Sequence, residues 1–414
     1  MFDLKTWLIS PRDPLIFRNG KPFTAAPGSR AETLPMPFPG TISGAVRTKA
    51  GTDPLSGKFD VERIKDHYNV QGPLLIELDN FEKVKEWFFP TPADAVFFES
   101  NEKDKGKKVG DCYDLKPMNT PSGIFLDKED LVLCGFEKNI KAKPFKSPPA
   151  FWSWKTLEKW LLQAVSKAEV ELETVGINQL PVQNRVHVAM NNKSQSAKDG
   201  ALFQTSAIEF ENKVQNESSL RDVRRFGLAV LTDLNLPDSG LGFLGGERRL
   251  VDWLFLETEI PFKSCPEKIR DEIVESGFCR LLLASPAYFN GSSHPSQALQ
   301  VLETEVIIGS SEPTNVLQDT GAKIIAMVNN RFQTVSGWDY QSKTPKPTKR
   351  LVPAGSVLFL KLSDEREERK LFIERVWMKN IGDDFQMCSA GYGLSLLGTW
   401  DGNLRSMNME ESDD

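Results

Sequence analysis

Two stretches decide the fold: Ser10-Pro-Arg-Asp-Pro-Leu-Ile-Phe-Arg-Asn-Gly-Lys-Pro-Phe23 and Leu34-Pro-Met-Pro-Phe-Pro-Gly-Thr-Ile-Ser-Gly-Ala-Val-Arg-Thr-Lys49. The first continues an apolar strand predicted at Lys5–Ile9 into a Pro-rich loop that carries Arg12 and Arg18. In the second, Thr41 is predicted to cap a helix that continues to Lys49. A helix N-terminus beside several cations suits an anion with a backbone, such as a phosphodiester, better than it suits a catalytic pocket.

The composition is that of an ordinary globular protein. The 414 residues suffice for two domains, and 40% of them are hydrophobic and 26% charged. No run of eighteen apolar residues predicts a membrane span. The N-terminus lacks the basic-then-apolar layout of a signal peptide. We therefore expect a cytoplasmic protein with no membrane partner.

The charge distribution is uneven along the chain. The formal net charge is -6, yet residues 1–50 carry four more Lys and Arg than Asp and Glu. An acidic average can therefore coexist with a basic face. The last residues, Glu-Glu-Ser-Asp-Asp, are typical of a disordered acidic tail, which we place at 409–414.

Metal, cofactor and disulfide chemistry have no support in the sequence. The five Cys are widely spaced without a C-x-x-C motif, and the three His never form H-E-x-x-H. We expect buried free thiols, no metal and no cofactor.

The order of strands and helices predicts an α+β fold. Helices are expected over 152–168 and 267–276, a buried strand over 279–285, and a helix or strand over 364–377. Val186, Val188 and Met190 alternate on one arm of an extended hairpin, whose tip is predicted as a long polar loop, Asn191–Gly200. Two successive βαββαβ-like units fit this order, one at 1–215 and one at 216–408.

The stretch Gly240-Leu-Gly-Phe-Leu-Gly245 matches G-x-G-x-x-G, but its surroundings are wrong for a dinucleotide-binding turn. Two interpretations remain open. Exposed amides and guanidinium groups could hold a phosphate, or the glycines could simply form a hairpin turn with two solvated arginines. The candidate contacts are Gly242, Gly245, Gly246, Arg248 and Arg249. Gly391 and Gly393 have the same alternatives, an RNA contact or close packing of backbone on backbone.

The helix predicted from Thr41 has free amides at its start and the positive end of its dipole there. The candidate phosphate contacts are Thr41, Ser43, Gly44, Arg47 and Lys49. The alternative is an ordinary capped helix that packs through Ile42, Ala45 and Val46.

Arg185 and His187 share one face of a strand. His187 could act as general acid or base in a metal-independent ribonuclease, although a histidine on a strand is usually only hydrogen-bonded. Asp13 is expected to cap the loop locally or to pair with Arg12, because no second carboxylate can be paired with it for catalysis.

In their order along the chain, these pieces resemble the third subunit of the Cmr module, a RAMP-superfamily protein of type III-B CRISPR effector complexes. The matching pieces are Pro11-Arg-Asp-Pro-Leu15, Phe17-Arg18, Pro39-Gly-Thr-Ile-Ser-Gly-Ala-Val-Arg47, Gly72-Pro73, Phe89-Pro-Thr-Pro-Ala-Asp94, Arg185-Val-His187, Gly200-Ala-Leu-Phe203, Leu244-Gly-Gly-Glu-Arg-Arg249, Gly337-Trp-Asp339 and Gly391-Tyr-Gly393. Residues 101–146 and the acidic tail match nothing in the family.

The resemblance implies two tandem ferredoxin-like (RRM-like) domains with long loop and hairpin insertions, and no catalytic activity. It implies a subunit in antiviral defence that holds the 5′ repeat-derived tag of the CRISPR RNA. The implied partners are the large palm-domain subunit and a backbone RAMP subunit. Two other interpretations stay open: a RAMP endoribonuclease that processes repeat RNA with His187, and the equivalent type III-A subunit. A purely structural adaptor is a further alternative.

Overall fold

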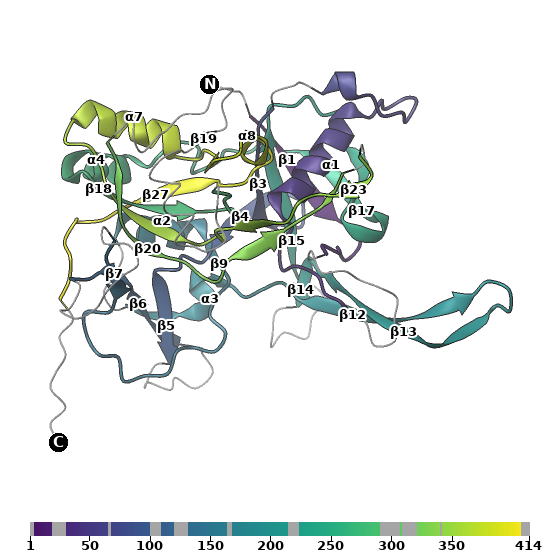
Figure 1. Cartoon of the computed structure of the whole chain (residues 1–414), viewed down its shortest axis with the longest axis horizontal. Coiled ribbons are helices and arrows are strands. Elements are labelled where there is room, and N and C mark those ends of the chain that lie inside the picture. The colour runs from purple at the N-terminus through teal and green to yellow at the C-terminus, as the bar shows by residue number, and fades with distance from the viewer. Residues whose placement is uncertain are drawn as a thin grey trace. The chain divides into compact units, whose positions relative to one another are not determined.

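The computed structural model describes residues 4–18, 30–64, 68–99, 109–119, 131–163, 168–213, 223–289, 307–308, 321–339 and 342–406. The protein is α+β with mostly antiparallel sheets (Figure 1). The chain forms two compact units. The first unit comprises Met1–Trp87, Gln179–Thr258 and Thr334–Lys349; the second comprises Phe88–Asn178, Glu259–Gln333 and Arg350–Asp414. The domain boundary predicted at 215/216 and the acidic tail predicted at 409–414 lie outside the described residues.

The first unit is built on an antiparallel sheet with the N-terminal strand at its centre. Its strands include β1 (Lys5–Pro11), β3 (Val70–Leu78), β14 (Glu211–Lys213), β15 (Val223–Thr232), β16 (Gly240–Leu244) and β17 (Arg249–Phe255). β1 lies between β15 and β17, β3 and β14 pair with β15, and β16 pairs with β17. Leu8 and Ile9 are fully buried on opposite faces of β1, as expected for an apolar run in a central strand. The strand predicted at Lys5–Ile9 is confirmed.

This sheet has a simple topology. With β1, β3, β15 and β17 counted as first to fourth, their order across the sheet is 4-1-3-2, and every neighbouring pair is antiparallel. Helix α1 (Pro39–Gly51) connects the first strand to the second.

Helix α1 begins earlier than the sequence indicated. Its N-cap is Phe38, without a capping side chain, and Pro39 opens the first turn. Proline suits this position because its fixed φ is helical and its missing N–H would have no intrahelical partner. The backbone N–H of Thr41 donates to the Phe38 carbonyl (2.9 Å), so Thr41 lies inside the first turn. The prediction that Thr41 is the N-cap is therefore wrong.

The first unit also contains a long hairpin, which Figure 1 shows as a two-stranded ribbon extending away from the sheet. It consists of β12 (Val182–Asn191) and β13 (Ser196–Ile208), and β2 (Arg30–Ala31) pairs with β13 in parallel. The polar loop predicted at Asn191–Gly200 is thus only a short turn over 192–195. Ladder hydrogen bonds use backbone groups, so polar side chains continue a strand where its faces are exposed.

The main sheet of the second unit repeats the same order. Its strands are β18 (Phe278–Leu283), β20 (Lys323–Val328), β25 (Val357–Lys361) and β27 (Ser395–Thr399). Counted from first to fourth in the chain, they also lie in the order 4-1-3-2 with antiparallel neighbours. Helices α4 (Glu267–Ser276) and α7 (Arg366–Val376) contact each other and β27. The helix predicted at 267–276 is confirmed, and residues 366–376 are helix rather than strand.

Shorter elements complete the two units. In or beginning within the second unit are α2 (Trp154–Leu162), α3 (Leu172–Val175), α8 (Phe385–Ser389), β5 (Ala95–Glu99), β6 (Val109–Asp114), β7 (Lys116–Pro117), β8 (Cys134–Gly135), β9 (Phe151–Ser153), β10 (Ala168–Glu171), β11 (Gly176–Ile177), β19 (Ile307–Ile308), β21 (Gln333–Val335) and β26 (Ile381–Gly382). The remaining elements are η1 (Val61–Arg63), η2 (Gly246–Arg248), β4 (Val84–Pro90), β22 (Trp338–Asp339), β23 (Thr344–Pro345) and β24 (Lys349–Leu351).

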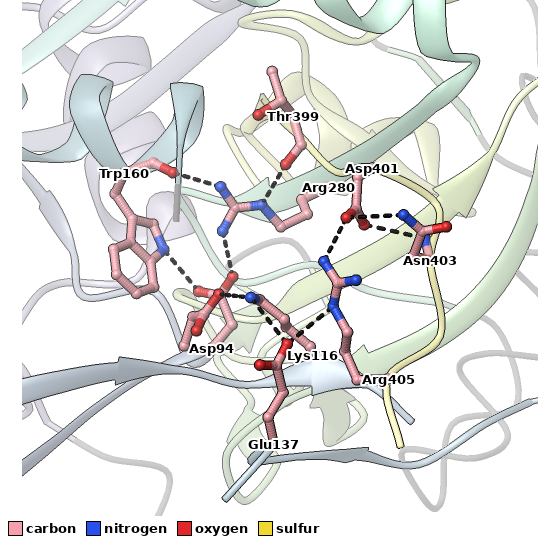
Figure 2. A network of polar contacts seen from close by, with 10 residues as sticks. Asp94, Lys116, Glu137, Trp160, Arg280, Thr399, Asp401, Asn403 and Arg405 are labelled. Carbon is pink, nitrogen blue, oxygen red and sulfur yellow. Dashed lines mark hydrogen bonds and ion pairs between the residues drawn. The ribbon is translucent and has the colours of Figure 1, made fainter. Parts of the chain in front are cut away.

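A buried arginine joins the three chain segments of the second unit (Figure 2). The guanidinium group of Arg280 on β18 is 2.6 Å from a carboxylate oxygen of Asp94. It also donates to the Trp160 carbonyl in the last turn of α2 and to the Thr399 carbonyl on β27. The indole N–H of Trp160 donates to the other Asp94 oxygen (3.0 Å). The side chains of Arg280 and Asp94 are 4% and 1% exposed, so the network is almost fully desolvated.

A second chain of ion pairs lies beside it in Figure 2. Lys116 is within 3.4 Å of carboxylate oxygens of both Asp114 and Glu137, and Arg405 reaches both Glu137 and Asp401. Burial raises the pKa of Asp114, and Lys116 only partly opposes this effect. These contacts hold residues 401–405, which follow β27 (Ser395–Thr399), beside β7 (Lys116–Pro117).

Candidate nucleic-acid interface

The loop that follows β1 is fastened to β17. The backbone N–H of Arg12 donates to the Leu250 carbonyl (3.0 Å), and the Leu250 N–H donates to the Asp13 carboxylate (3.1 Å). The Arg12 Nε atom lies 2.5 Å from an Asp252 oxygen, and this hydrogen bond raises the pKa of Arg12. Asp13 therefore caps a backbone amide, and the partner of Arg12 is Asp252. Both alternatives predicted for Asp13 are wrong, because the amide that it caps lies on β17 rather than in its own loop and Arg12 pairs with Asp252.

The glycine-rich turn between β16 and β17 packs against the same loop. Gly245 has φ +75°, and a Cβ there would lie 2.5 Å from the Ile16 carbonyl oxygen. The Gly246 N–H donates to that oxygen (2.7 Å). A Cβ on Gly242 would lie 2.7 Å from the indole nitrogen of Trp253. These glycines allow the turn to pack closely against Ile16 and Trp253. The Arg12–Arg18 loop and the Gly242–Arg249 turn, two segments predicted to contact RNA, therefore lie together.

The turn presents Arg248 and restrains Arg249. Glu247 and Arg248 both have positive φ, +59° and +50°, a strained region for residues with side chains. The exposed Arg248 guanidinium carbon lies 4.6 Å from the centre of the Phe243 ring, which is itself 50% exposed. The Arg249 side chain is only 14% exposed and lies 2.7 Å from a Glu247 oxygen. An exposed cation on an exposed aromatic ring is a surface on which a base can stack.

Helix α1 presents a narrow exposed stripe. Thr41, Gly44 and Arg47 recur every three residues, all are exposed, and no atom lies within 4 Å of a Cβ built on Gly44. The Arg47 guanidinium carbon is 5.8 Å from the centre of the Tyr68 ring. Ser43 faces inward and is only 2% exposed, so its hydroxyl is not presented with the others.

Lys49 serves as an anchor at the end of α1. Its ammonium group donates to the Asp238 carbonyl (3.1 Å) and lies 5.9 Å from the ring centres of both Trp7 and Trp253. Burial lowers the pKa of Lys49. These contacts hold the ammonium group against the sheet, away from the stripe that contains Arg47.

The other predicted residues of the first unit lie on or near the β12–β13 hairpin. Arg18 is exposed and forms a β-bridge with Thr33. Arg185 donates to the Gln183 side chain (2.6 Å). His187 stacks on Phe203 with ring centres 5.2 Å apart, and its Nε2 atom is 2.8 Å from the Thr205 hydroxyl. His187 is therefore a stacked and hydrogen-bonded histidine, as in the non-catalytic interpretation of this residue.

Gly391 and Gly393 belong to the second unit, where both are buried. The Gly391 carbonyl accepts from the Ser285 hydroxyl (2.7 Å), and the Gly393 N–H donates to the Pro286 carbonyl (2.8 Å). A Cβ on Gly393 would lie 1.8 Å from the Ile381 carbonyl oxygen. Their backbones are used in packing, and we assign them no RNA contact.

Sequence reasoning missed the aromatic partners of the two exposed arginines, Phe243 and Tyr68. A signal was present at Phe243, because Leu241 and Phe243 alternate with Gly240 and Gly242 along an edge strand, and both are at least half exposed. Tyr68 has no local signal, since its position over Arg47 depends on how β3 follows α1 in space.

We find no candidate metal site, candidate membrane span or disulfide bond in the described part of the chain. No group of three or more His, Cys, Asp or Glu in these residues could hold a metal ion, and no helix among them is long and apolar enough to cross a membrane. All five cysteines are free, and burial raises the pKa of Cys112 to about 12. This thiol therefore stays protonated at neutral pH.

The chain is similar to known proteins at the level of solved structures and of a protein family. No curated protein sequence matches the chain. Among solved structures, it is similar to a chain of "Cryo-EM structure of the Type III-B Cmr-beta bound to cognate target RNA and AMPPnP, state 1", with 13% identity, 86% of each chain covered and a TM-score of 0.43. A chain of "Cryo-EM structure of the Type III-B Cmr-beta bound to cognate target RNA" gives 14% identity, 86% of each chain and a TM-score of 0.42.

The sequence itself supplies the stronger match. Residues 7–400 match the family described as "CRISPR-associated protein (Cas_Cmr3)", which spans every motif on which the resemblance was based. The resemblance to the third subunit of the Cmr module is confirmed at the level of the family. The chain belongs to the Cas_Cmr3 family of CRISPR-associated proteins.

Proposed function

We propose that this protein is an RNA-binding subunit of a type III-B CRISPR effector complex and that it holds the 5′ repeat-derived tag of the CRISPR RNA. The observation that carries the proposal is the exposed Arg248 guanidinium stacked on Phe243, in a strained turn fastened to the Arg12–Arg18 loop. A cation and a ring in contact can neutralise a phosphate and stack a base.

The proposed surface is smaller than the one expected from the sequence. It consists of Arg18, the α1 stripe of Thr41, Gly44 and Arg47, and Arg248 with Phe243. Arg12, Lys49 and Arg249 support it by fixing the loop, the helix and the turn. All of these residues lie in the first unit.

Each unit is proposed to be a ferredoxin-like domain. The order 4-1-3-2 with antiparallel neighbours, found in both sheets, is the arrangement that a βαββαβ chain adopts. In the first unit the second crossover helix is replaced by the β16 strand and its glycine-rich turn, which places the turn beside β17. The proposed RNA surface thus uses the connection that departs from the pattern.

The expected effect of Arg248→Ala is a loss of affinity for tagged RNA of about 1–3 kcal/mol, through the lost phosphate charge and the uncovered ring. Fluorescence anisotropy over a range of salt concentrations measures it, and the salt slope should fall by about 0.7 for the one charge. Arg366→Ala is the matched control, because Arg366 is exposed on α7 of the second unit and paired with Glu275. Unchanged binding by Arg248→Ala would remove the turn from the interface.

We also propose that the protein does not cleave RNA. The contacts of His187 with Phe203 and Thr205 support a structural role for the only described histidine. Incubation with labelled repeat RNA in EDTA, compared with the same reaction in Mg²⁺, should leave the RNA intact in both. Site-specific cleavage in EDTA that His187→Ala abolishes would instead establish the endoribonuclease alternative.

The proposed protein partners are the large palm-domain subunit and a backbone RAMP subunit. The β12–β13 hairpin supports a protein contact, because Val186, Met190 and Leu202 on one of its faces are 71%, 52% and 58% exposed. An apolar face of this kind on a two-stranded ribbon is typical of a surface that a partner covers.

A further inference from the structure

We infer that the β22–β23 hairpin is a second contact for single-stranded RNA, in which Trp338 stacks a base and Lys343 and Lys346 bind the adjacent phosphates. The inference rests on the proposed RNA-binding function and extends it to a surface formed by other residues of the first unit. Nothing in the interface described above includes this hairpin.

The hairpin has a defined backbone that positions the tryptophan. Trp338 lies directly opposite Pro345 in the antiparallel β22–β23 pair, so the two side chains share one face. The Lys346 N–H donates to the Gly337 carbonyl (2.8 Å), and the Ser336 hydroxyl donates to the Lys346 carbonyl (2.8 Å). The base of the hairpin is therefore closed next to Trp338.

Trp338 is 51% exposed and has no described aromatic partner. Tryptophan is seldom left this exposed, because its burial contributes more than that of most side chains. An indole on a paired strand, with proline across from it, offers an exposed flat face. Every nucleobase has a flat face that can stack on such a ring.

The charge of the hairpin is entirely positive on the strand that faces Trp338. Residues 342–349 contain three lysines and no acid, in a chain with a net charge of -6. Lys343 and Lys346 are exposed, and no described acidic side chain pairs with either. A Cβ on Gly337 would lie 3.7 Å from the Lys346 Cδ atom, which places the aliphatic part of this lysine beside the residue before Trp338.

The combination favours RNA over an acidic peptide. A peptide would be held by the lysines and would make little use of a flat indole, whereas a single strand offers a base and a phosphate at each step. Because stacking is tolerant of sequence, this contact should not distinguish the tag from other single-stranded RNA.

The test measures binding of the full-length protein to two labelled RNAs, one carrying the repeat-derived tag followed by guide sequence and one an oligouridylate. Trp338→Ala is expected to weaken both between about 5- and 150-fold, since each stacked base contributes about 1–3 kcal/mol. Trp338→Phe should retain most of the affinity. Lys343→Ala/Lys346→Ala should reduce the salt slope by about 1.4.

Matched controls separate this contact from general effects. Phe81→Ala removes an aromatic side chain that is 83% exposed in the same unit, and Lys268→Ala/Lys370→Ala removes two exposed charges from α4 and α7. Both are expected to bind either RNA like the parent protein. Thermal unfolding of every variant checks that the fold is retained.

The outcomes distinguish this inference from the proposed function. If Arg248→Ala weakens binding of tagged RNA and Trp338→Ala weakens neither RNA, the inference is overturned and the proposed function stands. If Trp338→Ala weakens binding of both RNAs and Arg248→Ala weakens binding of neither, the inference stands and the proposed tag-binding surface at Arg248 is overturned. If the hairpin variants bind both RNAs like the parent protein, and binding of polyglutamate requires Lys343 and Lys346, the hairpin is a protein contact. This outcome also overturns the inference.

Discussion

Arg280→Ala is expected to lower the free energy of unfolding by about 3–5 kcal/mol, the cost of leaving a buried charge without its partner. The Asp94 carboxylate would remain 1% exposed with only the indole N–H of Trp160 as a donor. The carbonyls of Trp160 and Thr399 would lose the donors that Arg280 supplies. Pulse proteolysis in urea measures the loss, and hydrogen exchange should show it in β18, α2 and β27.

A double-mutant cycle separates the charge from the packing. Asp94→Asn keeps an oxygen for the Trp160 N–H and removes the charge. Arg280→Met with Asp94→Asn should therefore be more stable than Arg280→Met alone, because no buried charge remains. Arg366→Ala, at an exposed ion pair on α7, should change stability by less than about 1 kcal/mol. Equal losses for Arg280→Ala and Arg366→Ala would contradict the role of burial.

Gly393→Ala is expected to destabilise the second unit by about 3 kcal/mol or more. Gly393 has φ +82°, which a residue with a Cβ adopts only with strain, and the added atom would lie 1.8 Å from the Ile381 carbonyl oxygen. That oxygen belongs to the backbone of β26, so the chain itself has to move. The urea midpoint, followed by circular dichroism, measures the effect.

Gly44→Ala is the matched substitution. Gly44 lies inside helix α1, where nothing is within 4 Å of the added Cβ and alanine is the better helix former by about 0.5–1 kcal/mol. It should leave stability unchanged or raise it. If Gly393→Ala is equally harmless, the close backbone approach at Ile381 does not constrain the fold. Because Gly44 is in the proposed RNA surface, the same variant also reports whether a methyl group there weakens RNA binding.

The sequence predicted an element correctly where residues at the ends of that element determine its bounds. Helix α4 occupies the predicted range because Gly277, at φ +74°, stops it in the left-handed conformation. Helix α2 was predicted to begin at Trp152 but begins at Trp154, since Trp152 pairs in β9 and Ser153 caps the helix. Apolar spacing alone cannot distinguish a residue just before a helix from one inside it.

In the candidate interface, some residues were predicted from the sequence and others were missed. Arg47 and Arg248 were predicted and are exposed, while Phe243 and Tyr68, which lie against them, were missed. Ser43 was placed on the RNA side because the helix was expected to start at Thr41, although its position in the turn directs it inward. Exposure is a property of the packed sheet, so the residue type alone did not reveal it.

By itself the sequence determined the family, through motifs in a fixed order, and the strands and helices whose patterns are local. Only the tertiary structure decided that β15, from residue 223 onward, lies between β1 and β3, and that Arg280 pairs with a carboxylate 186 residues earlier. It also decided that Arg248 is exposed on a ring while its neighbour Arg249 is held by Glu247. Strand order, burial and pairing depend on contacts between distant segments, and such contacts leave no periodicity in the sequence.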